Sequence, residues 1–184
     1  MDAVLLKRAE QTNVPWKNGG GMTRALLCWP PGASLTDFRW RLSVATIARN
    51  GPFSAFPGYR RSLVLLEGEG MDLDFGDRQQ RVDPAHPRVD FAGEARLDCR
   101  LLNGPTVDFN LMIGVDQGPA ELHLESVSGS WRCGAERGQL CAAYLRSGQM
   151  ETPLGDLESG DLIYGSELSG SGRAELLCLR LPVK

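Results

Sequence analysis

Histidine is scarce in this chain: among 184 residues only His86 and His123 occur. His86 lies in a Pro-Ala-His-Pro segment, and His123 alternates with leucines between Glu121 and Glu125. A metal-binding cupin commonly uses two or three histidines and a carboxylate, often as His-x-His followed by Glu. Neither histidine has such partners at that spacing, so both are predicted to be exposed and no metal site is expected.

The cysteines lack the spacing of a structural site. They form an odd set of five without a Cys-x-x-Cys pair, which argues against a disulfide framework and against a zinc clip. We therefore expect reduced thiols that pack as small hydrophobic side chains. The five are Cys28, Cys99, Cys133, Cys141 and Cys178.

Long apolar runs and basic stripes are also missing. Nowhere do roughly 18 apolar residues follow one another, and the first residues have too short an apolar run for a signal peptide. Lysines and arginines are scattered and the net charge is -3, which gives no footprint for a phosphate backbone. We expect a cytoplasmic protein without nucleic acid or membrane partners. Because no phosphate-binding loop, dinucleotide fingerprint or nucleophile elbow occurs, no cofactor is predicted.

The sequence is instead rich in turn-forming residues. Its 22 glycines and 11 prolines divide it into short apolar stretches, which is typical of β-structure. Helical periodicity is nearly absent, and the one short helix expected is Ser54–Phe56. Strands are predicted at 25–29, 38–45, 62–66, 70–75, 96–102, 109–115, 121–127, 140–146, 161–164 and 174–181.

A weak internal repeat accompanies this pattern. Displacing the chain by 79 residues aligns eight identities in 34 positions, from Leu66 with Leu145 to Cys99 with Cys178. The repeat favours an all-β, bicupin-like fold made of two fused cupin or jelly-roll β-barrel halves. The halves are expected at residues 1–115 and 116–184, packed as one compact unit. A single larger sandwich or barrel is the alternative.

Three segments concentrate polar residues able to carry chemistry. In the first, 15–24, three glycines free the backbone to present N–H groups to an anion, although an Asn-Gly hairpin turn would also explain them. The second, 50–61, combines aromatic rings, prolines and arginines that could wall a pocket or form only a small hydrophobic cluster. In the third, alternation places Asp108, Asn110 and Met112 on one face of a strand, either buried with partners or in water.

These segments carry a family resemblance. PWKNGGGMTR, WRLSVA, NGPFSAFPGYRR, LLEGEG and GPTVDFNLM resemble the successive signature blocks of the HutD/Ves family, in the family's order. The resemblance implies a bacterial, metal-free bicupin associated with histidine utilisation, which binds a metabolite such as formylglutamate or urocanate and regulates rather than catalyses. The residues carried over are Trp16, Lys17, Asn18, Gly19, Gly20, Gly21, Thr23, Arg24, Arg41, Ser43, Phe53, Ser54, Phe56, Pro57, Gly58, Arg61, Asp108, Phe109, Asn110 and Met112.

The sequence departs from the family pattern at two places. Asn50 stands where the family more often has Asp, so a partner for a cation is missing there. Ala25 and Leu26 replace a more usual Glu-Ile after Arg24.

The hypothesis is a site that holds a small carboxylate. Arginine suits this role because its planar guanidinium forms two parallel hydrogen bonds with a carboxylate. Three function classes follow: a metabolite-binding regulator or sensor, a metal-free isomerase or hydrolase using Asp108 or Lys17, and a protein whose surface, through a cupin-like homodimer, serves mainly another protein. The cations expected are Arg24, Arg41 and Arg61, the aromatic walls Trp16, Phe53 and Phe56, and the polar groups Ser54, Asp108 and Asn110.

Overall fold

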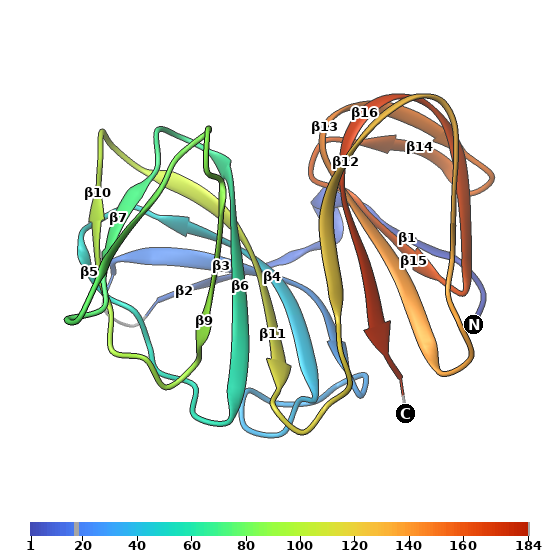
Figure 1. The fold of residues 1–184 in the computed structure, drawn as a ribbon. Coiled ribbons are helices and arrows are strands. Elements are labelled where there is room, and N and C mark those ends of the chain that lie inside the picture. The colour runs from blue at the N-terminus through green and yellow to red at the C-terminus, as the bar shows by residue number, and fades with distance from the viewer. Residues whose placement is uncertain (17–18, 184) are drawn as a thin grey trace. The chain divides into compact units, whose positions relative to one another are not determined.

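The computed structural model describes residues 1–16 and 19–183, which form strands and one three-residue 3-10 helix (Figure 1). This bears out the all-β class with almost no helix. The elements are β1 (Val4–Leu6), η1 (Arg8–Glu10), β2 (Thr12–Pro15), β3 (Gly21–Trp29), β4 (Trp40–Ile47), β5 (Gly51–Pro52), β6 (Tyr59–Glu67), β7 (Met71–Asp74), β8 (Gln79–Val82), β9 (Arg88–Ala92), β10 (Asp98–Leu101), β11 (Thr106–Gly114), β12 (Glu121–Gly134), β13 (Gln139–Thr152), β14 (Gly155–Glu158), β15 (Leu162–Gly165) and β16 (Glu167–Pro182).

Two compact units make up the chain. The central unit comprises residues 12–116, and the terminal unit comprises residues 1–11 and 117–184. The prediction assigned residues 1–115 to one half. The structure instead places the first eleven residues with the terminal unit, because β1 pairs with β15 and the buried Asp161 accepts hydrogen bonds from Lys7 Nζ and the Arg8 amide.

The central unit has two antiparallel sheets. Its six-stranded sheet has the order β2-β3-β4-β11-β6-β9, and its four-stranded sheet has the order β5-β10-β7-β8. Ile47, Leu63 and Leu65 of the larger sheet form one core cluster with Met71 and Leu73 of the smaller sheet. The face of the larger sheet that carries these side chains is called the inner face below.

The terminal unit is one curved sheet with the order β1-β15-β13-β16-β12, with β14 added to β13. Its core includes Trp131, Leu145, Met150 and Leu176. Gly148 has a φ of +90°, and a Cβ there would lie 2.2 Å from the carbonyl oxygen of Arg173. Only glycine permits this close approach between β13 and β16.

Both units share an order of strands. The sequence β9-β6-β11-β4 in the central unit corresponds to β15-β13-β16-β12 in the terminal unit. A β-bulge lies at the same place in each: Leu66 is the extra residue of β6 opposite the step from Val107 to Asp108, and Arg146 is the extra residue of β13 opposite the step from Glu175 to Leu176. The bulge therefore aligns the two units residue by residue.

Some predicted features are corrected. The sheets are open, not closed barrels. No helix forms at Ser54–Phe56, because the amides of Phe53 and Phe56 donate to the carbonyls of Leu97 and Gly93 and not within a helical turn. All ten predicted strands overlap observed ones, whereas the short strands β1, β2, β5, β8, β9 and β14 were not predicted.

Candidate ligand-binding site

Strand β11 places two polar side chains in the interior of the central unit. Asp108 and Asn110 are opposite Leu65 and Leu63 of β6, and directly paired antiparallel residues point to the same face of a sheet. Both side chains therefore lie on the inner face, where Asp108 is fully buried and Asn110 nearly so. The alternative of an edge strand with its polar face in water does not hold, since β11 lies between β4 and β6.

Arg61 lies beside them in an aromatic enclosure. Its Nη2 donates to Asn110 Oδ1 at 3.1 Å, and its Nη1 donates to the carbonyl oxygen of Ser54 at 3.2 Å. Its Cζ is 5.5, 5.6 and 5.0 Å from the ring centroids of Phe53, Phe56 and Phe91. The cation–π contacts and hydrogen bonds together fix the guanidinium. Only 8% of the surface of Arg61 is exposed.

Asp108 contributes a buried carboxyl group whose pKa is strongly raised. Its Oδ2 accepts a hydrogen bond from Asn110 Nδ2, while its Oδ1, like Arg61 Nε, has no hydrogen-bond partner among the described residues. Burial raises the pKa of Asp108 to about 7, against the opposing effects of Arg61 and Asn110. Burial also lowers the pKa of Arg61 to about 10, an effect that the charge of Asp108 opposes.

A second cation shares the inner face. Arg41 is directly opposite Met112, which is directly opposite Arg61 on its other side. The two arginines are thus two strands apart, roughly 10 Å between Cα atoms. Arg41 is half-buried, and burial lowers its pKa.

The inner face reaches solvent at β3. Ser43 is buried and follows the same alternation as Arg41. Ala25, directly opposite Ser43, is exposed.

The glycine segment packs on the end of β4. The Trp16 amide donates to the carbonyl of Gly21, the Gly19 amide donates to the carbonyl of Trp16, and Ala48 donates to Gly20. Trp16 Nε1 also donates to Thr23 Oγ1 at 2.7 Å. Gly19 has a φ of +67°, so this turn requires glycine for its backbone. Lys17 and Asn18 lie outside the described residues.

Arg24 does not join the other two arginines. It is paired with Val44 of β4, and Val44 is in turn paired with Phe109. Strand alternation puts this row on the face opposite to Asp108, Asn110 and Arg61. The predicted convergence of Arg24 with Arg61 is therefore wrong, whereas Thr23, the preceding residue, lies on the inner face.

Two residues of this cluster were not predicted. Phe91 of β9 is paired with Arg61 and supplies the third ring. The alternation of buried Val89 and Phe91 with exposed neighbours could have revealed this strand. Thr106 is buried on the inner face, and its Oγ1 has no hydrogen-bond partner within the described part of the chain.

The departure at Asn50 has a structural counterpart. Its Oδ1 accepts a hydrogen bond from the Leu101 amide at 2.9 Å. Asn50 therefore binds a backbone amide and not a cation.

The two histidines are exposed, and the five cysteines are free. In the described residues, no helix has the length and apolar character needed to cross a membrane.

Comparison with known proteins decides the family. The family model described as HutD matches residues 8–176. This chain belongs to the HutD family. Among curated relatives of this HutD chain, an uncharacterised 21.2 kDa protein in the hutC 3' region of Pseudomonas putida is 38% identical over 118 residues, covering 64% of this chain and 62% of the relative. Protein Ves of Citrobacter koseri is 33% identical over 135 residues, covering 65% and 70%. The chain thus matches about three fifths to seven tenths of the length of these two relatives.

Solved structures cover more of the HutD chain. HutD from Pseudomonas fluorescens SBW25, solved in a formate condition, has a TM-score of 0.80 at 29% identity and covers 97% of this chain and 98% of its own. A conserved protein of unknown function, PA5104 from Pseudomonas aeruginosa PAO1, has a TM-score of 0.81 at 26% identity, with 98% of each chain covered. The bacterial pirin YhhW from Escherichia coli, in complex with nickel(II), has a TM-score of 0.73 at 10% identity over both whole chains. At that identity it shows only the cupin-like fold.

Proposed function

We propose that this HutD protein binds a small carboxylate metabolite on the inner face of its central unit, and that it does so without a metal ion. The observation that carries the proposal is the buried cluster of Arg61, Asn110 and Asp108, with Arg41 on the same face. Arginine side chains are rarely buried unless they are paired with an acceptor group. A ligand carboxylate would supply an acceptor for Arg61 Nε, which has none among the described residues, and could also interact with the Arg41 guanidinium.

The surroundings favour an organic acid over a bare anion. Phe53, Phe56 and Phe91 offer apolar surface around Arg61, and removal of water strengthens each charged hydrogen bond. Asn110 presents an amide that can read a formyl or amide oxygen. Formylglutamate offers carboxylates and a formyl oxygen, and urocanate offers a carboxylate on a flat conjugated ring, so these two are the ligands of first choice.

The role we infer is that of a cytoplasmic regulator or sensor linked to histidine utilisation. Support comes from the family and from the P. putida relative, whose name places it in the hutC 3' region. A homodimer formed through an edge strand stays a prediction, which size-exclusion chromatography with light scattering would check.

Thermal unfolding with a panel of formate, glutamate, formylglutamate and urocanate tests the proposal. A ligand present at 100 times its Kd should stabilise the protein by about 2.7 kcal/mol. Arg61→Ala should abolish the shift, while Arg24→Ala, on the opposite face, should retain it. A full shift in Arg61→Ala, or its loss only in Arg24→Ala, would contradict the proposed site.

One observation favours a second function. Asp108 has a pKa near neutrality, which suits a general acid or base, so the chain could be a metal-free isomerase or hydrolase of an acidic metabolite. Incubation of the best ligand with the protein, followed by mass spectrometry, distinguishes the two. Turnover that Asp108→Asn abolishes would establish the enzyme, whereas unchanged ligand after prolonged incubation supports the binder.

A further inference from the structure

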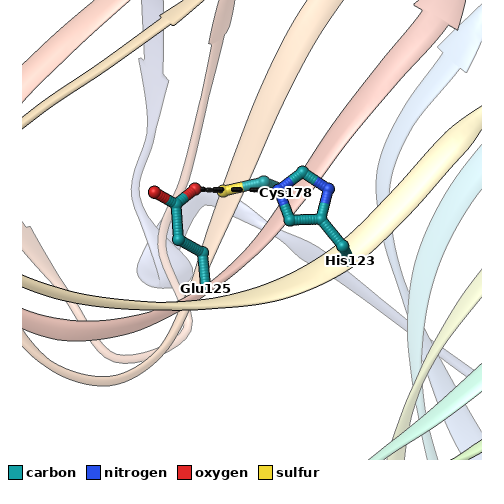
Figure 2. Close-up of side chains that lie close together, drawn as sticks. All are labelled: His123, Glu125 and Cys178. Carbon is teal, nitrogen blue, oxygen red and sulfur yellow. Dashed lines mark hydrogen bonds and ion pairs between the residues drawn. The ribbon is translucent and has the colours of Figure 1, made fainter.

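A second cluster of reactive side chains lies in the terminal unit. His123 and Glu125 extend from β12, and Cys178 extends from the adjacent strand β16, directly opposite His123. Figure 2 shows the three side chains turned toward one another. Their candidate ligand atoms all lie within 4.8 Å of one another.

The distances suit a tetrahedral metal ion. Glu125 Oε2 is 3.3 Å from Cys178 Sγ and 3.7 Å from His123 Nε2. Zinc bonds of about 2.0 Å to oxygen or nitrogen and about 2.3 Å to sulfur give ligand–ligand separations of roughly 3.3 to 3.6 Å in a tetrahedron. Small side-chain rotations are therefore enough to close the three groups on one ion.

The carboxylate is already oriented from outside the cluster. Trp131 Nε1 donates a hydrogen bond to Glu125 Oε2 at 3.1 Å. Hydrogen bonds of this kind commonly fix the ligands of metal sites. Next to the cluster, Arg180 is paired with Glu121 at 2.6 Å, so its charge is compensated and does not oppose a cation.

The cluster shares one position with the candidate site of the central unit. With the β-bulges aligned, Asn110 corresponds to Cys178, because each lies two residues beyond the residue that ends the bulge step, Asp108 or Leu176. Ser43, opposite Asn110, then corresponds to His123, and Ala45, opposite Asp108, corresponds to Glu125. Each unit thus presents polar side chains at one equivalent position of its sheet, but with different chemistry.

We infer that the terminal unit has a binding site for a divalent transition metal ion of the zinc type, formed by His123, Glu125 and Cys178. Nitrogen, oxygen and sulfur donors together suit Zn²⁺, and three protein ligands leave a fourth position for water. On binding, the Cys178 thiol loses its proton to solvent and its sulfur bonds the metal. Cys178 is buried, while the exposed His123 provides access from solvent.

Metal titration of the reduced, chelator-treated protein tests this inference. We expect one Zn²⁺ per chain, measured by competition with a chromophoric chelator, and proton release in weakly buffered solution. Co²⁺ should give the absorption of a tetrahedral site with a sulfur-to-cobalt charge-transfer band. His123→Ala and Glu125→Gln should weaken binding at least tenfold, and Cys178→Ala should remove the charge-transfer band.

Matched controls come from the same chain. His86→Ala and Cys28→Ala remove a histidine and a cysteine outside the cluster and should leave Zn²⁺ binding unchanged. Trp131→Phe keeps an aromatic ring but removes the indole N–H that Glu125 accepts, and it should cost about 10- to 100-fold in affinity.

His123→Ala decides the matter, because its exposed side chain can be removed without a core cavity. Undiminished Zn²⁺ binding by this variant, or a cobalt spectrum without the sulfur band, would overturn the site. Either result would leave the carboxylate site of the central unit untouched, since the two sites share no residue.

Discussion

Arg61 reaches Asp108 through Asn110. The guanidinium donates to Asn110 Oδ1, and Asn110 Nδ2 donates to Asp108. The amide thus separates two groups that would otherwise form a buried ion pair. Because the carboxylate is not directly neutralised, burial dominates and the pKa of Asp108 rises to about 7. This arrangement leaves Arg61 Nε without a hydrogen-bond acceptor among the described residues and gives Asp108 a proton that can be lost near neutral pH.

Asp108 should make the stability of the protein depend on pH. Its pKa is 3.8 unperturbed and about 7 when folded, so the folded state binds more protons between these values and stability falls as pH rises through them. Among the described residues of this sheet, Arg61 and Arg41 are the charged groups that share its face. In urea unfolding, the free energy of unfolding of Asp108→Asn relative to that of the wild type should increase by several kcal/mol as the pH rises from about 4 to about 8. A difference independent of pH would contradict the raised pKa.

Ligand affinity should also depend on pH. A bound carboxylate near Asp108 disfavours the ionised form of that side chain, so binding is linked to proton uptake. Calorimetry should show affinity that weakens by up to about tenfold per pH unit above neutrality. Asp108→Asn, which cannot ionise, should bind equally at pH 6 and pH 8. A wild-type affinity that is constant over this range would place the ligand away from Asp108.

Gly21→Ala should destabilise the central unit. A Cβ at this position would lie 2.3 Å from the carbonyl oxygen of Thr46 and 3.1 Å from the Trp16 ring. Overpacking of this kind typically costs about 1–3 kcal/mol, measurable as a lower Tm. Gly118→Ala is the matched control, since nothing lies within 4 Å of its Cβ. Equal Tm values for the two variants would show that Gly21 is not sterically required.

Asp161→Ala should release the N-terminal strand of the terminal unit. The Asp161 carboxylate accepts hydrogen bonds from Lys7 Nζ at 2.5 Å, the Arg8 amide at 2.7 Å and the Glu158 amide at 2.9 Å. Its removal should cost about 2–3 kcal/mol and raise hydrogen exchange in β1. Asp156→Ala, at an exposed position, serves as the control. Unchanged exchange in β1 would mean that strand pairing alone holds it.

The 79-residue displacement agrees with the strand pairing only in places: by the bulge alignment Leu66 corresponds to Arg146 and not to Leu145. Met71 of β7 pairs with the next strand, β8, and Met150 of β13 pairs with the next strand, β14. These two methionines therefore agree with the 79-residue displacement. Cys99 and Cys178 do not correspond, because Cys99 lies on β10 and Cys178 on the part of β16 equivalent to β11. The connections in the two units differ in length, and a comparison without gaps cannot follow them. The common origin of the two units stays a prediction.

The arginines show a different limit. Alternation along a strand predicts that Arg41 and Ser43 share a face, and that Asp108 and Asn110 share one. It does not tell which face is inside, and a shift of one residue moves a side chain to the opposite face. Arg24 lies one residue from Thr23 and therefore points away from Arg61.

By itself, the amino-acid sequence determined the all-β class, the family and two of the three segments, 50–61 and 108–112, from which most residues around Arg61 and Asp108 are drawn. These depend on turn residues, alternation and motifs along the chain. Only the tertiary structure decided which groups meet. Strand register brings Phe91 to Arg61 and excludes Arg24. The same pairing of strands distant in sequence places His123 beside Cys178, because hydrogen bonds between strands, and not spacing along the chain, set these neighbours.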